Sequence, residues 1–81
     1  MYYLYILKSK TDKKLYIGYS SNLKIRITEH LNGKVRSTKS RRPLELIFYE
    51  AFKSRDDAKR RERYFKTSKG KVSLNQILRK S

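Results

Sequence analysis

The start of the chain constrains the fold most, because residues 2–8 (YYLYILK) are almost all apolar or aromatic. Such a run is typical of a strand that is buried on both faces. Residues 14–19 (KLYIGY) form a second strand-like segment, and residues 11–13 between them have the composition of a turn. The short link predicts a β-hairpin over 2–19. Gly18 indicates a bulge or the close approach of another group.

A helix is expected after the hairpin, over about residues 23–31. Asn22 and the two serines before it are capping residues. Leu23, Ile27 and Leu31 recur every four residues, which makes one apolar stripe. An Asn-Gly pair then ends the helix.

The second half of the chain predicts one strand and two helices. The strand is expected over 44–52, a helix over about 55–66, a break over 67–72 and a closing helix over 73–79. The residues expected on the inward side of the closing helix are Leu74, Ile77 and Leu78. The order β-β-α-β-α-α predicts an α+β fold, with a small, mostly antiparallel three-stranded sheet flanked by helices. The length suits a single domain over 1–81.

Charge and composition narrow the range of possible functions. The chain has 22 Lys and Arg residues against 7 Asp and Glu, a net charge of +15, which favours nucleic acid over a membrane as partner. The absence of cysteine excludes disulfides and thiolate zinc sites, and a single histidine excludes a histidine metal cluster. No apolar run approaches the roughly 20 residues of a membrane span. The first residues also lack the features of a secretory signal, so a cytoplasmic protein is expected.

Three features of the sequence are not explained by core packing alone. Arg26 and His30 lie four residues apart and share one side of their helix, either as a solvated charge and a boundary histidine or as site residues. Glu62 faces inward beside Phe65, either in a structural salt bridge or as a ligand of a hard cation such as Mg²⁺. Seven scattered acids do not suit a two-metal site. The hairpin also carries five tyrosines, for cross-strand packing or acid–base chemistry: Tyr2, Tyr3, Tyr5, Tyr16 and Tyr19.

The hairpin motifs resemble a known family. Residues 3–5 (YLY), followed after ten residues by 16–18 (YIG), are similar to the two motifs that name the GIY-YIG nuclease domain. Arg26 and His30 on the next helix, and Glu62 on the one after, match the order of the family's Arg, His and Glu. The resemblance covers nearly the whole chain.

The small stand-alone bacterial members of the family are the most similar. They also carry a basic loop that ends in Arg-Arg-Pro, here 41–43, and a helix of the form Ala-x-x-x-Glu, here 58–62. The chain departs from the family at Tyr3, where the family name has Gly, and at Tyr19, where several nucleases have lysine. Asn75 is a loose match to a late asparagine of the family.

The resemblance implies hydrolysis of DNA phosphodiester bonds with one divalent ion, Mg²⁺ or Mn²⁺. Glu62 would hold the ion, and Tyr5 or Tyr16, with Tyr5 favoured, would position or deprotonate the attacking water. Arg26 would offset charge on the reacting phosphate, and His30 would assist proton transfer or hold a tyrosine hydroxyl. Further candidate site residues are Tyr19, Asn22 and Asn75.

The DNA backbone is expected to follow the basic loop (residues 34–42) and the second helix (about residues 55–66). Such phosphate contacts add affinity without sequence specificity, so low specificity is expected, with a preference for branched or nicked DNA of the repair or recombination type. The expected DNA-binding residues are Lys34, Arg36, Lys39, Arg41, Arg42, Lys59, Arg60 and Arg63.

Two other functions fit the same sequence. One is a non-catalytic nucleic-acid-binding module on this fold, with tyrosines that stack on unpaired bases. The other is a catalytic subunit that needs a targeting protein partner. The presence of all five residues expected for catalysis favours an active enzyme. The sequence does not indicate an oligomeric state.

Overall fold

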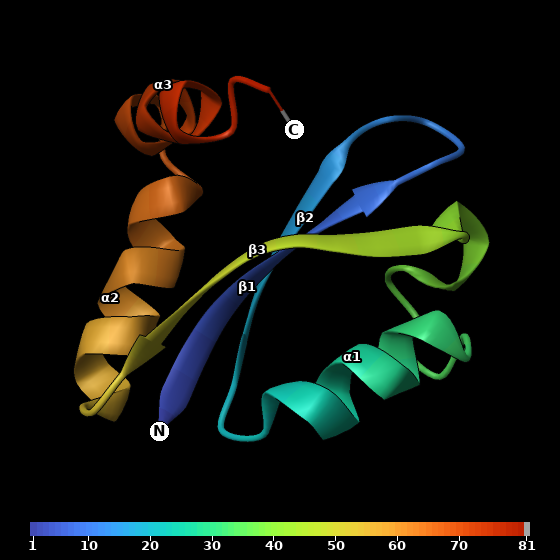
Figure 1. Cartoon of the computed structure of the whole chain (residues 1–81), viewed down its shortest axis with the longest axis horizontal. Coiled ribbons are helices and arrows are strands. Elements are labelled where there is room, and N and C mark those ends of the chain that lie inside the picture. Colours follow the sequence, from blue (N-terminus) through green and yellow to red (C-terminus); the bar gives the residue numbers. More distant parts are fainter. Residues whose placement is uncertain (81) are drawn as a thin grey trace.

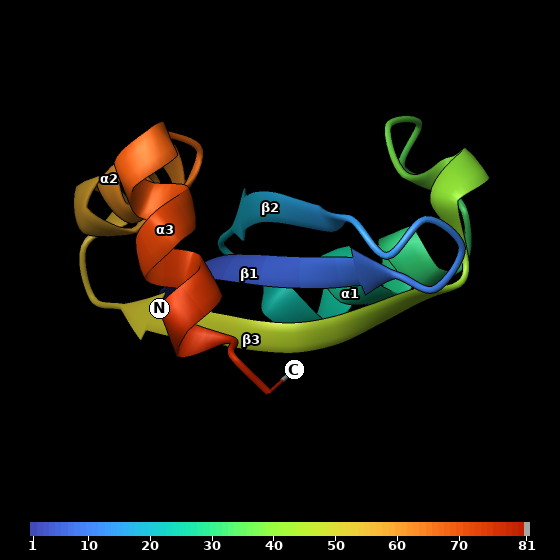
Figure 2. The ribbon, with the colours of Figure 1, turned by 90° about the horizontal axis from the view of Figure 1, so that it is seen from above.

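The computed structural model describes residues 1–80, which form a three-stranded sheet and three α-helices. The elements are β1 (Tyr2–Ser9), β2 (Leu15–Ser20), α1 (Leu23–Leu31), a 3-10 turn η1 (Lys39–Arg41), β3 (Leu44–Phe52), α2 (Arg55–Phe65) and α3 (Ser68–Ile77). The sheet is antiparallel with strand order β2-β1-β3. Figures 1 and 2 show α2 and α3 on one side of it and α1 on the other. The predicted α+β fold and element order are confirmed.

The central strand β1 is buried on both faces, as its sequence predicts. Leu4 and Ile6 point toward α2 and α3, where they pack with Phe65. Tyr5 and Leu7 point to the opposite face, which α1 covers. These four neighbouring side chains of β1 are all fully buried. Because β3 and β2 pair with both edges of β1, the direction of the Tyr5 side chain is fixed by the sheet itself.

Gly18 makes room for Tyr5. The two residues are partners in the β1–β2 ladder, and a Cβ atom on Gly18 would overlap the ring and hydroxyl of Tyr5. The close approach predicted at this glycine is confirmed. The irregularity of the sheet lies elsewhere, between Ile6 and Leu7 in the pairing of β1 with β3. The missing side chain therefore lets the Tyr5 ring extend over β2.

The closing helix begins earlier than expected, so the predicted break over 67–72 is wrong. Thr67 caps α3, because its hydroxyl accepts a hydrogen bond of 3.0 Å from the Gly70 amide. Glycine is a poor helix former, which is why the sequence suggested a break. Here Gly70 is buried against the last turn of α2, and this contact offsets the low propensity.

Two residues expected to face inward are exposed. Leu31 is 49% exposed and Ile77 is 45% exposed. Each is the last residue of its helix, where side chains are less completely covered than in the middle turns. The remaining residues that were expected to face inward pack against the core: Leu23, Ile27, Leu74 and Leu78.

The basic loop before β3 is tied to the end of β1. Ser9 is fully buried and donates its hydroxyl to the carbonyl of Arg41 at 2.7 Å. Thr11 donates its hydroxyl to the carbonyl of Arg42 at 2.8 Å. Together these bonds fix the C-terminal part of the loop, which lies next to the hairpin.

The contact at Gly70 gives a test of the fold. Gly70→Ala gains about 1 kcal/mol of intrinsic helix propensity. We nevertheless expect it to lower the free energy of unfolding by about 1–3 kcal/mol, because the new Cβ overlaps the Tyr64 carbonyl. Urea unfolding followed by circular dichroism measures the change. Gln76→Ala, at an exposed position of α3, is the control and should stay within about 0.5 kcal/mol of the parent. A stabilised Gly70→Ala would contradict the close contact.

Candidate active site

The fold brings together the five residues predicted for catalysis. Tyr5 comes from β1, Tyr16 from β2, Arg26 and His30 from α1, and Glu62 from α2. The three rings form a cluster, with centroids 5.5 Å apart for Tyr5 and His30 and 5.1 Å apart for Tyr16 and His30. Arg26 interacts with the Tyr5 hydroxyl and lowers the pKa of Tyr5, whereas the negative charge of Glu62 raises it. Four separate elements thus contribute to one site.

A buried hydrogen bond joins the β1 residue of this cluster to one of its α1 residues. The Tyr5 hydroxyl lies 2.7 Å from Nε2 of His30, and both residues are fully buried. The alternative that His30 is a boundary histidine is therefore wrong. Because Tyr5 and His30 are 25 residues apart, the bond fixes α1 against the central strand.

Thr38 extends this hydrogen-bonded chain and was not among the predicted site residues. Its Oγ1 lies 2.8 Å from Nδ1 of His30, and its hydroxyl donates to the carbonyl of Val35 over 3.5 Å. The Thr38 side chain is fully buried. A single threonine in a loop of lysines and arginines carries no sequence signal, because its contact with His30 depends on how the loop folds back.

The environment keeps both partners of the buried bond neutral. Burial raises the pKa of the Tyr5 phenol above its usual value, and the interaction with Arg26 offsets part of that rise. Burial also lowers the pKa of His30 to about 4, and the charge of Arg26 adds to the effect. A histidine with this pKa is almost entirely in its neutral form near pH 7. Its role in the free protein is that of a hydrogen-bond partner.

The cluster has a buried side and an exposed side. Tyr5 and His30 are fully buried, whereas Tyr16 is half-buried and the side chain of Arg26 is 37% exposed. Arg26 also pairs with Glu29 at 3.2 Å on the same helix. Tyr16 and Arg26 are therefore the members of the cluster that a large ligand reaches most easily.

Glu62 lies at the edge of the cluster, with its side chain 20% exposed. It accepts a hydrogen bond of 3.0 Å from Lys66, one turn further along α2. The neighbouring Arg61 pairs instead with Glu50 at 2.9 Å. Among residues 1–80, no three His, Asp or Glu side chains gather into a metal site. A single half-buried carboxylate fits Mg²⁺ that keeps several waters and binds substrate phosphates.

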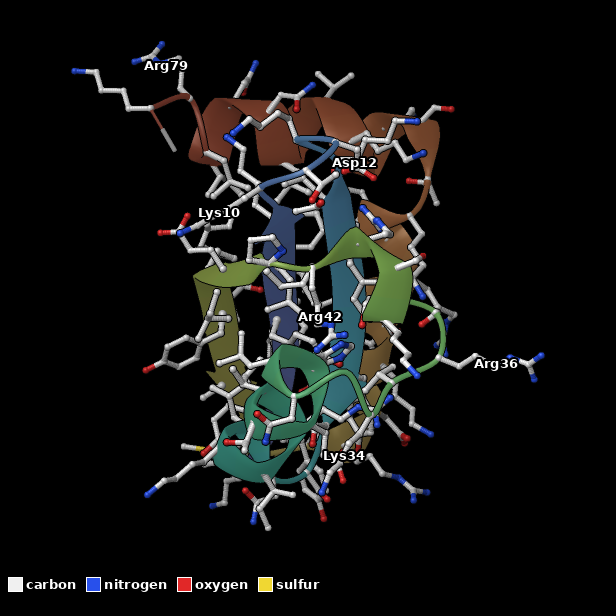
Figure 3. All side chains as sticks on the ribbon, turned by 90° about the vertical axis from the view of Figure 1, so that its right-hand side faces the viewer. Lys10, Asp12, Lys34, Arg36, Arg42 and Arg79 are labelled. Atoms are coloured by element: carbon white, nitrogen blue, oxygen red, sulfur yellow. The ribbon has the colours of Figure 1, made fainter. Side chains whose placement is uncertain are left out.

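The basic loop presents part of its predicted charge to solvent. Figure 3 shows Arg36 extending outward from the loop on the side of β2, with Lys34 nearby in the same loop. Arg41 is paired with Asp12 at 3.3 Å, which neutralises part of its charge. Arg42 is exposed, and its Nε donates to the carbonyl of Lys39 at 3.0 Å.

On α2 the predicted DNA-binding residues differ in their surroundings. The Lys59 ammonium lies 5.2 Å from the centre of the Tyr19 ring, which joins Tyr19 to the basic surface. Arg60 pairs with Asp57 at 3.2 Å, and Arg63 is exposed. The exposed charges that are best placed for a polyanion are therefore Lys34, Arg36, Lys39, Arg42 and Arg63.

The two candidate asparagines have different places. Asn22 caps α1, because its side chain accepts a hydrogen bond of 3.1 Å from the Ile25 amide, and in this way it fixes the start of the helix that carries Arg26. Asn75 is exposed on α3, where it borders a groove with Lys14 and Lys71. None of the helices described over residues 1–80 is long and apolar enough to span a bilayer.

The depressed pKa of His30 predicts how stability depends on pH. Above about pH 6.5 the histidine is neutral in both the folded and the unfolded chain. As the pH falls from 6.5 toward 4, only the unfolded chain takes up the proton, so the fold loses about 3 kcal/mol. Urea unfolding at a series of pH values measures this loss. His30→Gln is the control, since it removes this contribution and leaves the carboxylates unchanged. Equal pH dependence in both proteins would contradict the neutral, buried histidine.

Comparison with known proteins supports the resemblance seen in the sequence. The family model of the GIY-YIG catalytic domain matches residues 1–75. A UPF0213 protein of Staphylococcus haemolyticus is 43% identical over 77 residues, which are 94% of this chain and 93% of the relative. A UPF0213 protein of Clostridium perfringens is 42% identical over 79 residues, 96% of this chain and 80% of the relative.

A solved structure agrees with these matches. The solution NMR structure of a UPF0213 protein from Bacillus halodurans is 34% identical in sequence and superposes with a TM-score of 0.59. The match covers 95% of this chain and 85% of that one. Together with the clustered tyrosines, Arg26, His30 and Glu62, these matches show that the chain belongs to the GIY-YIG family.

Proposed function

We propose that this protein is an endonuclease that hydrolyses DNA phosphodiester bonds with the help of one divalent metal ion. The observation that carries the proposal is the convergence of Tyr5, Tyr16, Arg26, His30 and Glu62 from four elements on one site. A cluster of phenols, a guanidinium and a carboxylate is suited to phosphate chemistry, because it offers an acid–base group, a fixed positive charge and a hard ligand.

Arg26 is the group that would contact the phosphate. Its side chain is 37% exposed, and its guanidinium interacts with the Tyr5 hydroxyl on the inner side. A guanidinium is always charged and offers several donors in a fork that matches phosphate oxygens. In this position it stabilises the negative charge that builds up on the phosphate during attack.

The two tyrosines have different roles in this proposal. Tyr5 is the favoured base on the resemblance alone, but it is fully buried, whereas Tyr16 is half-buried. A base must come within hydrogen-bond reach of the water that it deprotonates. We therefore assign contact with the attacking water to Tyr16. Tyr5, held by His30, positions Arg26 from behind.

Glu62 is the residue that would hold the metal ion, either Mg²⁺ or Mn²⁺. Bound there, such an ion would neutralise charge on the phosphate and the leaving oxygen. Glu62 is partnered by Lys66, in an exposed ion pair of a kind worth about 0.3–0.5 kcal/mol. A divalent ion can replace so weak a partner at little cost.

The charge of the protein supports DNA as the substrate. With a net charge of +15 and exposed basic residues on the loop and on α2, the protein would follow the phosphate backbone. Contacts of this kind do not read bases, so cleavage with low sequence specificity is expected. Preference for branched or nicked DNA belongs to the same proposal.

A cleavage assay tests the proposal. Linear, nicked, flapped and four-way DNA would be incubated with the protein at low salt, with Mg²⁺, Mn²⁺ or EDTA. We expect metal-dependent cutting, which Glu62→Gln lowers by about a hundredfold or more because a metal contributes several kcal/mol. DNA binding by Glu62→Gln, measured by fluorescence anisotropy, should be retained. Glu45→Gln makes the same charge change on the exposed side of β3 and should cut normally.

Three results would each contradict a part of this proposal. Unchanged cleavage by Glu62→Gln would remove the assignment of the metal to this carboxylate. Tight DNA binding by the parent protein with no cutting in any metal would favour a nucleic-acid-binding module, or a subunit that acts only with a targeting partner. Cleavage at a sharply defined sequence would contradict the low specificity.

The role of Arg26 is tested separately. Arg26→Ala should lower kcat by about a thousandfold, as expected for an arginine that stabilises charge in phosphoryl transfer, with little change in KM. Single-turnover cleavage at saturating protein measures the rate of the chemical step. Lys24→Ala, an exposed cation on the same helix, is the matched control. An Arg26→Ala variant with a raised KM and an unchanged kcat would make Arg26 a backbone clamp.

A further inference from the structure

The buried chain of polar groups at the site has a defined direction. It runs from the Tyr5 hydroxyl through both ring nitrogens of His30 to Thr38 and the carbonyl of Val35. A neutral imidazole has one protonated and one unprotonated nitrogen. The two ends of the chain therefore decide which nitrogen of His30 carries the proton.

One arrangement of protons satisfies every member of the chain. If Nδ1 of His30 is protonated, it donates to Thr38, whose own hydroxyl donates to the carbonyl of Val35. Nε2 is then free to accept the proton of the Tyr5 hydroxyl. The Tyr5 oxygen keeps its lone pairs for Arg26, which can only donate.

The opposite arrangement leaves one proton without an acceptor. If Nε2 were protonated, it would donate to the Tyr5 oxygen, and the hydroxyl proton of Tyr5 would need another acceptor. Within residues 1–80 no other acceptor forms a hydrogen bond with that hydroxyl. Tyr16 and Glu62 act on it only electrostatically, and Arg26 is a cation that can only donate. An unsatisfied buried donor costs about 1–3 kcal/mol. This cost selects the first arrangement.

We infer that Thr38 is a positioning residue that holds His30 in the tautomer protonated at Nδ1. In this tautomer Tyr5 donates to His30 and turns its oxygen toward Arg26, so the guanidinium is held in place. The effect on cleavage rests on the proposed nuclease function. The tautomer itself does not, because it follows from the hydrogen bonds of the free protein.

Nitrogen NMR of the single histidine tests the inference without any substrate. In protein labelled with ¹⁵N-histidine, correlations between ring protons and nitrogens distinguish Nδ1 from Nε2 and report which one is protonated. We expect a protonated Nδ1 in the parent protein and in Thr38→Ser, which keeps the hydroxyl. Thr38→Val has nearly the same shape without the hydroxyl, and it should shift the population toward a protonated Nε2.

Kinetics provides the second measurement. Thr38→Val should lower kcat for DNA cleavage by about tenfold or more with little change in KM, because Arg26 loses its lone-pair partner. Thr38→Ser should restore most of the rate. A role in stability alone would not link the loss of rate to the change of tautomer.

The outcomes separate this inference from the proposed function. A protonated Nε2 in the parent protein overturns it, even if the protein cuts DNA well. An unchanged tautomer in Thr38→Val, or a normal cleavage rate in that variant after its tautomer has changed, overturns it as well. If Thr38→Val does not fold, the parent and Thr38→Ser decide, since both must show a protonated Nδ1. A parent protein that shows the expected tautomer but never cuts DNA rejects the nuclease proposal alone.

Discussion

The hydrogen bond between Tyr5 and His30 is the interaction on which the rest of this site depends. It forms because Gly18 leaves space over β2 for the Tyr5 ring and because α1 carries His30 to the same face of the sheet. The bond is 2.7 Å long and buried, so it joins the central strand to a helix that otherwise packs through few residues. The cluster of candidate site residues is therefore also part of the core.

Charge is distributed unequally across the site. The inner half is uncharged near neutral pH, because burial raises the pKa of Tyr5 and lowers that of His30. The outer half carries the ions, Arg26 and Glu62, which are partly exposed and have weak partners on their own helices. In a protein with a net charge of +15, a neutral interior avoids adding further repulsion to the fold. Under the proposed function, these ions would exchange their present partners for a phosphate and a metal ion.

Periodicity in the sequence was sufficient to predict most of the helices and strands, whereas the grouping of Tyr5, Tyr16 and Glu62 with Arg26 and His30 came from the family resemblance. The unbroken apolar run predicted the buried strand β1, and the spacing of four residues put Arg26 and His30 on one side of α1. Local patterns failed where tertiary contacts decide. The start of α3 depends on the packing of Gly70 against α2, and the contact of Thr38 with His30 depends on the path of a loop. Neither contact has a periodic signal.

The partners of the charged side chains could not be predicted from the sequence either. Composition predicts a basic surface, but it does not show that Arg41 and Arg60 are occupied by aspartates or that Lys59 lies over Tyr19. An ion pair forms only when two side chains meet in the fold. The number of basic side chains without an acidic partner is thus smaller than the composition suggests. Under the proposed function, the salt dependence of DNA binding would report that smaller number.

A chain of this size has little core, and this explains why its buried polar groups matter so much. Small domains bury only about 60% of their unfolded surface, so each fully buried side chain is a large part of what holds the fold. Tyr5 is the largest fully buried side chain among the described residues, and His30 and Thr38 are fully buried as well. Changes on the inner half of the site must therefore affect stability and chemistry together. Changes on the outer half, at Arg26 or Glu62, can affect chemistry alone, because those side chains already face solvent.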